Sequence, residues 1–360
     1  MSQLTEREIL AALSKVNDPE LHRDLVSLNM VQNVRIEGGG VKLRIDLTTP
    51  ACPLKGKIQG DVENALRAVP GVTAVEIEWG AQVRHGQKQE KGGNFIPGVK
   101  NVVLVGAGKG GVGKSTVALN LAAALRLEGA TVGLLDADFY GPSVPIMTGI
   151  SGKPTSVDGR TLEPMEAHGL KVMSIGFLVE PDQAMVWRGP MLHSAITQLL
   201  RDVNWGNLDY LVLDLPPGTG DVPLSLAQIV KAAGVVLVST PQDVALADVV
   251  KAKAMFDRVD VPVLGIVENM SDFVCPHCEK STPIFSTGGT HRAGEAMGIP
   301  LLGAIPLDLA IRMGGDKGTP VTVEYPDSKQ AQAFREMARK VAGRISVQAH
   351  QVKLPVFNLG

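Results

Sequence analysis

The sequence predicts an α/β protein, in which a doubly wound parallel sheet is preceded by a small α+β domain. From Val99 onward, short apolar runs such as NVVLVGAG and DYLVLDLP alternate with segments of helical spacing. Runs of this kind are typical of parallel strands that are buried on both faces, with helices between them. Before Val99 the pattern changes, because segments of alternating polarity surround a triple glycine.

The expected elements of the small domain follow from local signals. Thr5 followed by Glu8 is a helix N-cap signal. The triple glycine at 38–40 interrupts an alternating segment, which indicates a hairpin. Residues 57–71 have helical spacing and end at a Pro-Gly pair, and residues 72–79 alternate again as a strand. These elements predict a compact α+β domain.

A polar stretch separates the two parts of the chain. Residues 84–98, RHGQKQEKGGNFIPG, contain glycines and few apolar anchors, so we predict a flexible linker there. The small domain then covers residues 1–83, and the large α/β domain covers residues 99–360.

The composition is that of a globular protein in a reducing cytoplasm. The formal net charge of −2 gives no electrostatic basis for binding nucleic acid or an anionic membrane. No apolar run reaches the roughly 18 residues that span a bilayer. Three cysteines in a chain of 360 residues do not make a disulfide framework. We therefore expect a cytoplasmic protein without a nucleic-acid or membrane partner.

The most specific motif is Gly-x4-Gly-Lys-Ser, which runs from Gly108 to Ser115 between an apolar run and a helical one. Its glycines let successive backbone N–H groups turn toward phosphate oxygens, and the helix N-terminus adds partial positive charge. Lys114 supplies a point charge for the β- and γ-phosphates, and the Ser115 hydroxyl is offered to Mg²⁺. The motif predicts a triphosphate site. The residues expected to hold the nucleotide are Gly108, Lys109, Gly110, Gly111, Val112, Gly113, Lys114, Ser115 and Thr116.

Carboxylates follow two further predicted strands. DYLVLDLP contains Asp214, the form expected of an aspartate that holds Mg²⁺ through water, and GLLDAD contains Asp136 and Asp138. Because the carboxyl ends of parallel strands meet at one edge of the sheet, we expect these acids beside the phosphates, where one orients an attacking water. The alternative is an aspartate that caps a helix or bonds to a loop, and this interpretation is strongest for Asp136.

The stretch FVCPHC offers two thiols, Cys275 and Cys278, at the spacing of metal ligands. A tetrahedral zinc or an iron–sulfur cluster takes four ligands, and the remaining cysteine, Cys52, is far away in the sequence. The residues alone leave several arrangements open. Four thiolates from two chains can surround one cluster or one zinc, His277 or His291 can complete a zinc site in one chain, or the thiols can form a redox pair.

The loop carries a second lysine, Lys109, and here the sequence resembles the deviant Walker-A ATPases, which are marked by Lys-Gly-Gly-x-Gly-Lys-Ser/Thr and include MinD and ParA. Within that superfamily, residues 99–345 resemble the Mrp/ApbC-like iron–sulfur cluster carrier ATPases. The small domain resembles the metal–sulfur cluster assembly domain through NDPEL, residues 17–21, and TTPACP, residues 48–53. The stretches that carry the resemblance of the large domain are GKGGVGKST, DADFYGPSVP, VWRGPM, DLPPGTGD, STPQDVAL, VENMSDFVCPHC and IFSTGG.

The resemblance implies a P-loop NTPase that forms a homodimer, binds ATP and Mg²⁺ and hydrolyses ATP slowly. It implies that Cys275 and Cys278 of both protomers hold a [4Fe–4S] cluster, which passes to apoprotein recipients, with cluster-assembly scaffold proteins as further partners. Lys109 would reach across the dimer to the partner's nucleotide and neutralise developing charge.

The resemblance also assigns roles to individual positions. Lys109, Lys114 and Asp138 would act in hydrolysis, while Ser115 and Asp214 would hold Mg²⁺. Further positions are Asn269, which would contact the nucleotide base through its amide, and Trp187, Arg188 and Gly189, which would flank the dimer face.

Cys52 has two interpretations. A following helix N-terminus lowers the pKa of its thiol and makes it a transient cluster ligand or a partner contact, or the residue is a small buried hydrophobe. Two alternative functions also stay open, an ATP-dependent metallochaperone for zinc or nickel and a MinD/ParA-like positioning ATPase. The second needs a basic amphipathic tail or a basic surface, whereas the sequence ends SVQAHQVKLPVFNLG, with a single lysine.

Overall fold

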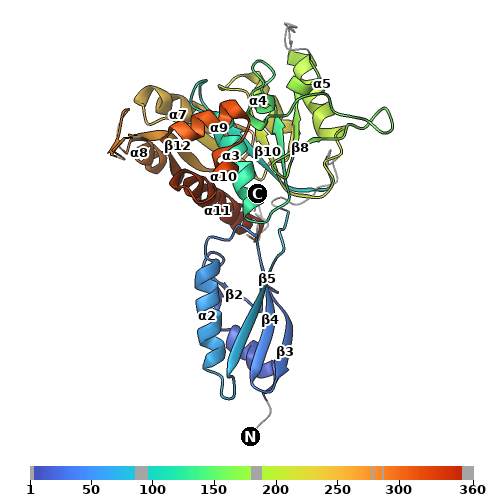
Figure 1. Cartoon of the computed structure of the whole chain (residues 1–360), viewed down its shortest axis with the longest axis vertical. Coiled ribbons are helices and arrows are strands. Elements are labelled where there is room, and N and C mark those ends of the chain that lie inside the picture. The colour runs from blue at the N-terminus through green and yellow to red at the C-terminus, as the bar shows by residue number, and fades with distance from the viewer. Residues whose placement is uncertain are drawn as a thin grey trace, which may run out of the picture. The chain divides into compact units, whose positions relative to one another are not determined.

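The chain folds into two compact units (Figure 1). One is built from the chain up to Arg84 together with the chain from Ala342 onward, and the other extends from His85 to Val341. The predicted linker, 84–98, falls largely on residues that are not described, so the boundaries at 83 and 99 stay predictions. The computed structural model describes residues 4–85, 96–179, 189–275, 277–278, 280–285 and 288–350.

The small unit contains a three-stranded sheet, as expected for an α+β fold. β3 is antiparallel to β4, and β5 is parallel to β4 because α2 forms the crossover between them. A separate short ribbon pairs β1 with β2. The elements are α1 (Glu6–Leu13), β1 (Asn17–Asp18), β2 (Arg23–Asp24), β3 (Val31–Glu37), β4 (Gly40–Leu47), α2 (Lys55–Arg67) and β5 (Ala74–Ala81).

Local chemistry explains why these elements form. The predicted N-cap of α1 is confirmed, because the Thr5 backbone N–H donates to the Glu8 carboxylate at 2.9 Å and the Glu8 N–H donates to Thr5 Oγ1 at 3.4 Å. Alternate residues of β4 point into the core, where α1 and α2 cover them. The largest core side chains are fully buried: Ile9, Leu13, Leu25, Leu43, Ile45, Ile58 and Leu66.

The large unit is a doubly wound α/β fold around one sheet. Its parallel strands have the order β9-β7-β10-β6-β11-β12-β14, and β8 and β13 are antiparallel to β9 and β12. The strands are β6 (Val99–Gly106), β7 (Val132–Asp136), β8 (Met165–Ala167), β9 (Leu170–Ser174), β10 (Leu208–Asp214), β11 (Gly234–Ser239), β12 (Val263–Val274), β13 (Ser281–Thr282) and β14 (Leu301–Leu307). The helices are α3 (Lys114–Leu127), α4 (Val144–Thr148), α5 (Gly189–Arg201), α6 (Asp221–Ile229), α7 (Asp243–Arg258), α8 (Gly289–Met297), α9 (Leu309–Lys317) and α10 (Val321–Glu324), with a 3₁₀ turn at Ile175–Phe177. The last helix, α11 (Lys329–His350), belongs to this unit as far as Val341.

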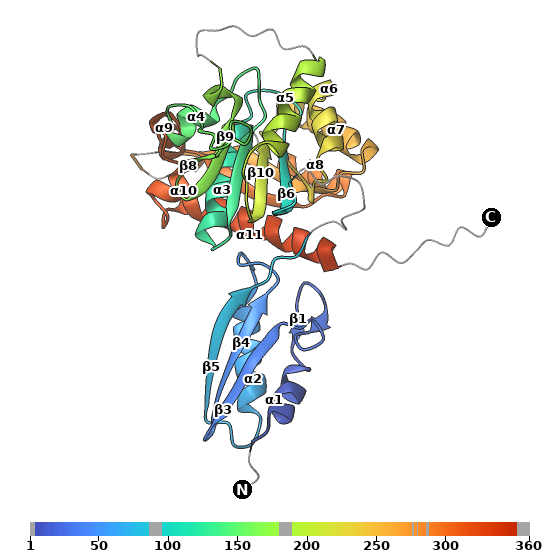
Figure 2. The same ribbon diagram turned by 90° about the vertical axis from the view of Figure 1, so that its right-hand side faces the viewer.

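The sheet is sandwiched between helices, as Figures 1 and 2 show. Every residue of β7 and β11 is buried, which confirms the expectation of strands covered on both faces. α3 is buried along nearly its whole length, from Val117 to Leu125. The first strand of the unit, β6, lies between β10 and β11, so later strands are added to the sheet on both sides of it. In such a fold a ligand binds at the carboxyl ends of the central strands.

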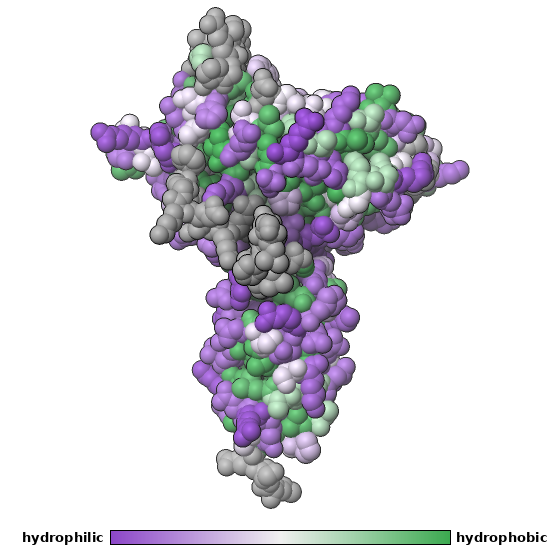
Figure 3. All heavy atoms as spheres, turned by 180° about the vertical axis from the view of Figure 1, so that it is seen from behind, coloured by the Kyte–Doolittle hydropathy of each residue, from purple (hydrophilic) through white to green (hydrophobic). Residues whose placement is uncertain are grey.

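The surface is mixed in polarity. On the face seen in Figure 3, apolar residues are interspersed among polar ones on both units. Within the described ranges, none of the helices has both the length and the apolar character needed to cross a bilayer.

Candidate nucleotide site and thiol hairpin

The glycine-rich loop joins the carboxyl end of β6 to the first turn of α3, as the motif predicts. Gly111 and Gly113 have φ values of 81° and 80°, in the left-handed region that favours glycine. Gly113 is the N-cap of α3, and no side chain caps the helix there. The backbone N–H groups of this first turn therefore face an anion without competition from a capping side chain.

Two glycines of the loop are required because of close approach to other segments. A Cβ on Gly108 would collide with the backbone of Asp248 in α7, and a Cβ on Gly113 would collide with the Asn269 amide. Gly110 differs, because the nearest atom to its Cβ would be a Pro217 carbon at 4.0 Å. The loop is thus fixed at both ends and open in the middle.

Lys114 occupies the centre of a buried charge cluster. Its ammonium lies 2.6 Å from Asp214 Oδ1 and 3.9 Å from Asp138 Oδ2, and the residue is only 6% exposed. The Ser115 hydroxyl lies 3.3 Å from the same ammonium. The structure therefore brings together the predicted lysine, serine and carboxylates at one edge of the sheet.

Asp136 is fully buried, as Asp214 is, and lies in register with Asp214 across β7 and β10. Burial, reinforced by the charge of Asp214, raises the pKa of Asp136 to about 7. Its oxygens accept hydrogen bonds from Ser174 Oγ and from the backbone N–H groups of Asp138 and Val144. Asp136 thus shapes the loop after β7, in line with the structural alternative for this residue.

Asp138 is less buried than Asp136 and points toward the lysine. Burial raises the pKa of the Asp138 carboxyl, while the nearby Lys114 ammonium opposes that shift. A carboxylate that is partly desolvated and close to Lys114, the lysine predicted to bind phosphate, is placed where a general base or a water-orienting group would act.

The donor set fits a magnesium ion. Asp214 Oδ2 is buried and has no hydrogen-bond partner among the residues that the structure describes, so it is left to accept from a group that is not protein. Carboxylate, hydroxyl and phosphate oxygens with water are the ligands that Mg²⁺ takes beside a nucleotide. Asp214 and Ser115 are the residues that fit this role.

Lys109 is half-buried, and in the part of the chain that the structure describes it has no ion-pair partner. Lys109 directly follows Gly108, whose backbone lies against α7. The backbone at Lys109 is therefore held in place, while its ammonium group has no ion-pair partner among the described residues. The predicted reach of Lys109 across a dimer stays a prediction.

Asn269 reaches the loop from β12. Its amide Nδ2 donates to the Val112 carbonyl at 2.9 Å, and the residue is 5% exposed. The expectation that Asn269 ends its strand is wrong, because β12 continues to Val274. The extension forms because β13 turns back and pairs with the end of β12.

The two thiols lie in the hairpin loop between β12 and β13. The Cys275 backbone N–H donates to the Lys280 carbonyl at 3.1 Å and closes the loop. Backbone N–H groups of His277 and Cys278 point at the Cys275 sulfur and lower the pKa of its thiol. Cys278 is exposed. A hairpin loop is not the helix start of a thioredoxin-type redox pair, so this geometry disfavours that alternative.

The described residues do not complete a four-ligand site within one chain. Over those ranges, no group of three or more His, Cys, Asp or Glu side chains is placed to hold a metal ion. His291 instead lies 3.5 Å from Glu295, one turn further along α8. His277 is exposed in the hairpin loop. The alternative of a zinc site completed by either histidine therefore has no support in the geometry.

Cys52 lies in the core of the small unit, and the expected lowering of its thiol pKa is wrong. The residue is 9% exposed, and burial raises the pKa of its thiol to about 11, with Glu20 and Asp18 adding to the shift. The N–H of Leu54 acts in the opposite direction but is outweighed by burial. The fold does bring NDPEL and TTPACP together, since Asp18 and Glu20 act on Cys52.

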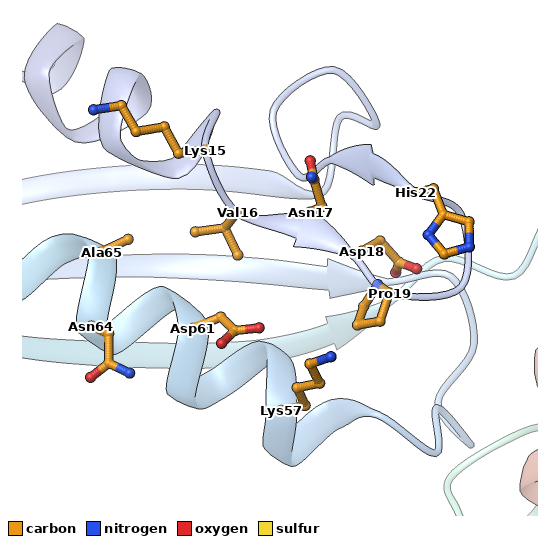
Figure 4. Close-up of a pocket in the computed structure, with 10 residues that line it drawn as sticks. All are labelled: Lys15, Val16, Asn17, Asp18, Pro19, His22, Lys57, Asp61, Asn64 and Ala65. Carbon is orange, nitrogen blue, oxygen red and sulfur yellow. The ribbon is translucent and has the colours of Figure 1, made fainter.

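A pocket that the sequence did not predict lies beside Asp18 (Figure 4). It has a volume of about 390 Å³ and lies between the β1–β2 ribbon and α2. Lys57 and Asp61 of α2 line it across from Asp18, and His22 lies at the same end of the pocket as Asp18. Asp18 accepts two backbone hydrogen bonds at 2.9 Å, from Glu20 and Leu21. The sequence did not predict this pocket, because its lining residues are spread over 50 positions and come together only when the β1–β2 ribbon packs beside α2.

The segment expected to flank a dimer face is mostly outside the described residues. Trp187 and Arg188 fall there, and Gly189 begins α5. Their predicted role stays a prediction.

A strand, a glycine loop and a helix that surround a buried lysine and carboxylates define a P-loop nucleotide-binding protein. A family model described as NUBPL iron-transfer P-loop NTPase matches residues 98–342, and one described as iron-sulfur cluster assembly protein matches residues 6–79. The chain belongs to the NUBPL iron-transfer P-loop NTPase family and carries a cluster assembly domain ahead of it. The resemblance to the Mrp/ApbC-like carrier ATPases is thereby confirmed.

Relatives match over nearly the whole chain. An iron-sulfur cluster carrier protein of Deinococcus radiodurans is 55% identical over 341 residues, 94% of this chain and 95% of the relative. A protein of the same name from Synechocystis is 48% identical over 351 residues, 96% of this chain and 99% of the relative. The solved structure of a nucleotide-binding protein from Archaeoglobus fulgidus in complex with ADP is 40% identical, with a TM-score of 0.58, over 66% of this chain and 93% of that one.

Proposed function

We propose that this protein is an ATP-binding and ATP-hydrolysing carrier, which holds a [4Fe–4S] cluster between two copies of the chain and delivers it to apoproteins in the cytoplasm. The observation that carries the proposal is the thiol hairpin. Cys275 and Cys278 are accessible and adjacent, the thiol pKa of Cys275 is lowered, and no further ligand lies beside them in the ranges that the structure describes. The relatives named iron-sulfur cluster carrier protein support the choice of cargo.

A homodimer completes the ligand set. Two copies related by a two-fold axis present the same surface to each other, so two thiols from each chain supply four thiolates. The position of the thiols at the tip of a hairpin, with Cys278 exposed, suits a site that lies against a second chain.

Transfer then consists of ligand exchange. Each bond between iron and the sulfur of Cys275 or Cys278 is replaced by a bond to a thiolate of the recipient, and the carrier thiolates are released without a change in oxidation state. A thiolate with a lowered pKa is a good leaving ligand at neutral pH. Apoprotein recipients and cluster-assembly scaffold proteins are the partners of this cycle.

The nucleotide site supports slow hydrolysis of ATP. Lys114 would bind the β- and γ-phosphates, Ser115 and Asp214 would hold Mg²⁺, and Asp138 would orient the attacking water. When bound, the magnesium ion supplies charge that polarises the phosphate oxygens. Lys109 of one protomer, which is unpaired among the described residues, reaches the nucleotide of its partner.

Anaerobic reconstitution tests the cargo and the ligands. The protein is incubated with iron and sulfide, and the sulfur-to-iron charge-transfer absorbance, bound iron, acid-labile sulfide and mass in solution are measured. We expect about four iron and four sulfide per dimer. Cys275→Ser and Cys278→Ser should each abolish the absorbance, whereas the control Cys52→Ser should retain it. A holoprotein that stays monomeric with its full iron content would contradict the shared site.

The same preparation separates the cluster carrier from a zinc or nickel metallochaperone. Four thiolates also suit Zn²⁺, so the anaerobically purified protein is assayed for zinc, nickel and iron together. Iron and labile sulfide that pass to an apo-ferredoxin support the cluster carrier. Zinc or nickel with no labile sulfide would support the metallochaperone.

A further inference from the structure

The thiol hairpin is attached to the nucleotide loop through an irregular part of β12. Asn269 pairs with Ile305 of β14, and Phe273 pairs with Leu307. Four steps along β12 thus correspond to two steps along β14, so residues 270–272 form a bulge between two regular parts of the strand. Strand pairing fixes the positions on both sides of this bulge and leaves the bulge itself as the place where the strand can bend.

Met270 lies in the bulge with a φ of 57°, in the left-handed region. A methionine gains nothing from this conformation, because its side chain makes no local hydrogen bond as Asn or Asp does, and the conformation is retained only where the surroundings enforce it. Backbone strain of this kind is often found where a segment has two arrangements of similar free energy.

The side of the bulge nearer the sheet contacts the phosphate loop. Asn269 donates to the Val112 carbonyl at 2.9 Å. The Asn269 amide also packs directly over Gly113, and a Cβ on Gly113 would lie 3.7 Å from the terminal methyl carbon of Met270. Since Gly113 is the N-cap of the helix that receives the phosphates, a change in this loop on nucleotide binding acts first on Asn269 and Met270.

The far side of the bulge moves with the thiols. Asp272 accepts hydrogen bonds from the hydroxyl of its neighbour Ser271 and from the hydroxyl of Ser281, and the second bond joins β12 to β13. Phe273 and Val274 pair with Thr282 and Ser281, and Cys275 follows directly. Residues 272–274 of β12 and Ser281 and Thr282 of β13 therefore form a paired ribbon, which would turn as one piece if the backbone at Met270 rotated.

We infer that Met270 is the joint that couples nucleotide occupancy of the phosphate loop to the position of Cys275 and Cys278. The inference deepens the proposed function, on which it rests, by naming the residue through which nucleotide regulates the thiol site. A change in the phosphate loop alters the contact of Asn269 with that loop. The backbone at Met270 then rotates, and the paired ends of β12 and β13 move together with the thiols. Met270 is a positioning residue and touches no reacting atom of the cargo.

The test uses the full-length, metal-free protein, so that it does not depend on cluster loading. The rates at which Cys275 and Cys278 react with a thiol reagent are measured by mass spectrometry without nucleotide, with Mg·ADP and with Mg·ATP. We expect nucleotide to change the rates by about fivefold or more, the lower end of typical coupling between two sites. Nucleotide affinity is measured in parallel by calorimetry.

Three variants make the result specific. Met270→Gly frees the backbone and should bring the ratio of rates with and without nucleotide to about one, with little change in ADP affinity. Met270→Asn keeps a residue that accepts the left-handed conformation and should retain the response. The control is Asp260→Gly, since Asp260 has a φ of 55° and precedes the other end of β12. It should behave as the wild type.

A response that persists in Met270→Gly would overturn the inference, and so would an equal loss in Asp260→Gly. If the response to nucleotide is lost in both Met270→Gly and Met270→Asn, the coupling depends on the methionine side chain. That result would overturn the inference that the backbone at Met270 rotates. The inference would also be overturned if the thiol reaction rates of the wild type were the same with and without nucleotide. If that protein still bound a cluster, the proposed carrier function would stand. Failure of reconstitution with a normal nucleotide response would instead contradict the proposed function alone.

Discussion

The Lys114 ammonium lies 2.6 Å from Oδ1 of Asp214, in a site where the lysine is 6% exposed and the aspartate is fully buried. This ion pair joins the first turn of α3 to the carboxyl end of β10. Asp136 lies in register with Asp214, and the same cation opposes the rise in the pKa of Asp136 that burial causes. Lys114 therefore contributes to the stability of the large unit, in addition to its proposed role in phosphate binding.

Lys114→Ala should abolish binding of Mg·ATP and also destabilise the protein. Removing one partner of a buried pair leaves an uncompensated charge, which typically costs about 3–5 kcal/mol of unfolding free energy. Lys100→Ala is a matched control, because Lys100 pairs with Asp209 at 2.8 Å but its side chain is 38% exposed. That substitution should cost no more than about 1 kcal/mol. Denaturant unfolding and calorimetry with ATP measure both effects, and equal destabilisation by the two variants would contradict the argument.

The two ends of the phosphate loop should tolerate substitution differently from its middle. Gly108→Ala places a Cβ against the backbone of Asp248, which cannot move away as a side chain would, so we expect loss of nucleotide binding and a lower melting temperature. Gly110→Ala meets nothing nearer than 4.0 Å, and it should leave the melting temperature unchanged. Thermal unfolding without nucleotide compares the pair. Equal melting temperatures for the two variants would show that α7 does not press on the loop.

The raised pKa of Asp136 predicts how stability depends on pH. In the unfolded chain the carboxyl ionises near its ordinary pKa of 3.8, whereas in the folded protein it retains its proton up to about 7. Between these values the native state binds more protons, so stability contributed by this group falls as pH rises and levels off above about 7. Asp136→Asn should flatten this part of the profile. Denaturation midpoints from pH 5 to pH 8 give the comparison, and parallel profiles for variant and wild type would contradict the assignment.

The sequence could predict which residues lie together in the candidate nucleotide site, because most of them are close in sequence. The loop and the helix start that follows it are contiguous from Gly108 to Thr116, and the strand before them is strongly apolar. Asp138 and Asp214 could be added because the ends of parallel strands converge at one edge of a sheet. The topology of a parallel sheet thus predicts that these two aspartates lie close together, although they are far apart in sequence.

The thiol environments could not be predicted in the same way. Whether a thiol is buried or exposed depends on packing between segments that are distant in sequence. Cys52 is buried in the core, and the two acids that act on its thiol, Asp18 and Glu20, lie more than 30 positions before it. The continuation of β12 beyond Asn269 likewise depends on a short partner strand, β13, whose two residues carry no strand signal of their own. These features are set by tertiary contacts that outweigh local propensity.

The three cysteines should differ widely in reactivity in the metal-free protein. Backbone N–H groups lower the pKa of Cys275 below its ordinary value of 9.0, whereas burial raises the pKa of Cys52 to about 11. The thiolate is the reactive form, and at pH 8 a thiol of pKa 11 has roughly 100-fold less of it than an ordinary thiol. Alkylation of Cys275 should therefore reach its plateau rate at a lower pH than an ordinary thiol, while alkylation of Cys52 should still rise above pH 10. Peptide mapping after timed treatment with iodoacetamide gives each rate, and Cys275→Ser is the control that should leave the Cys52 rate unchanged. If Cys52 reacts as fast as Cys275 at pH 7, its thiol is accessible and cannot be the core residue that the small unit requires.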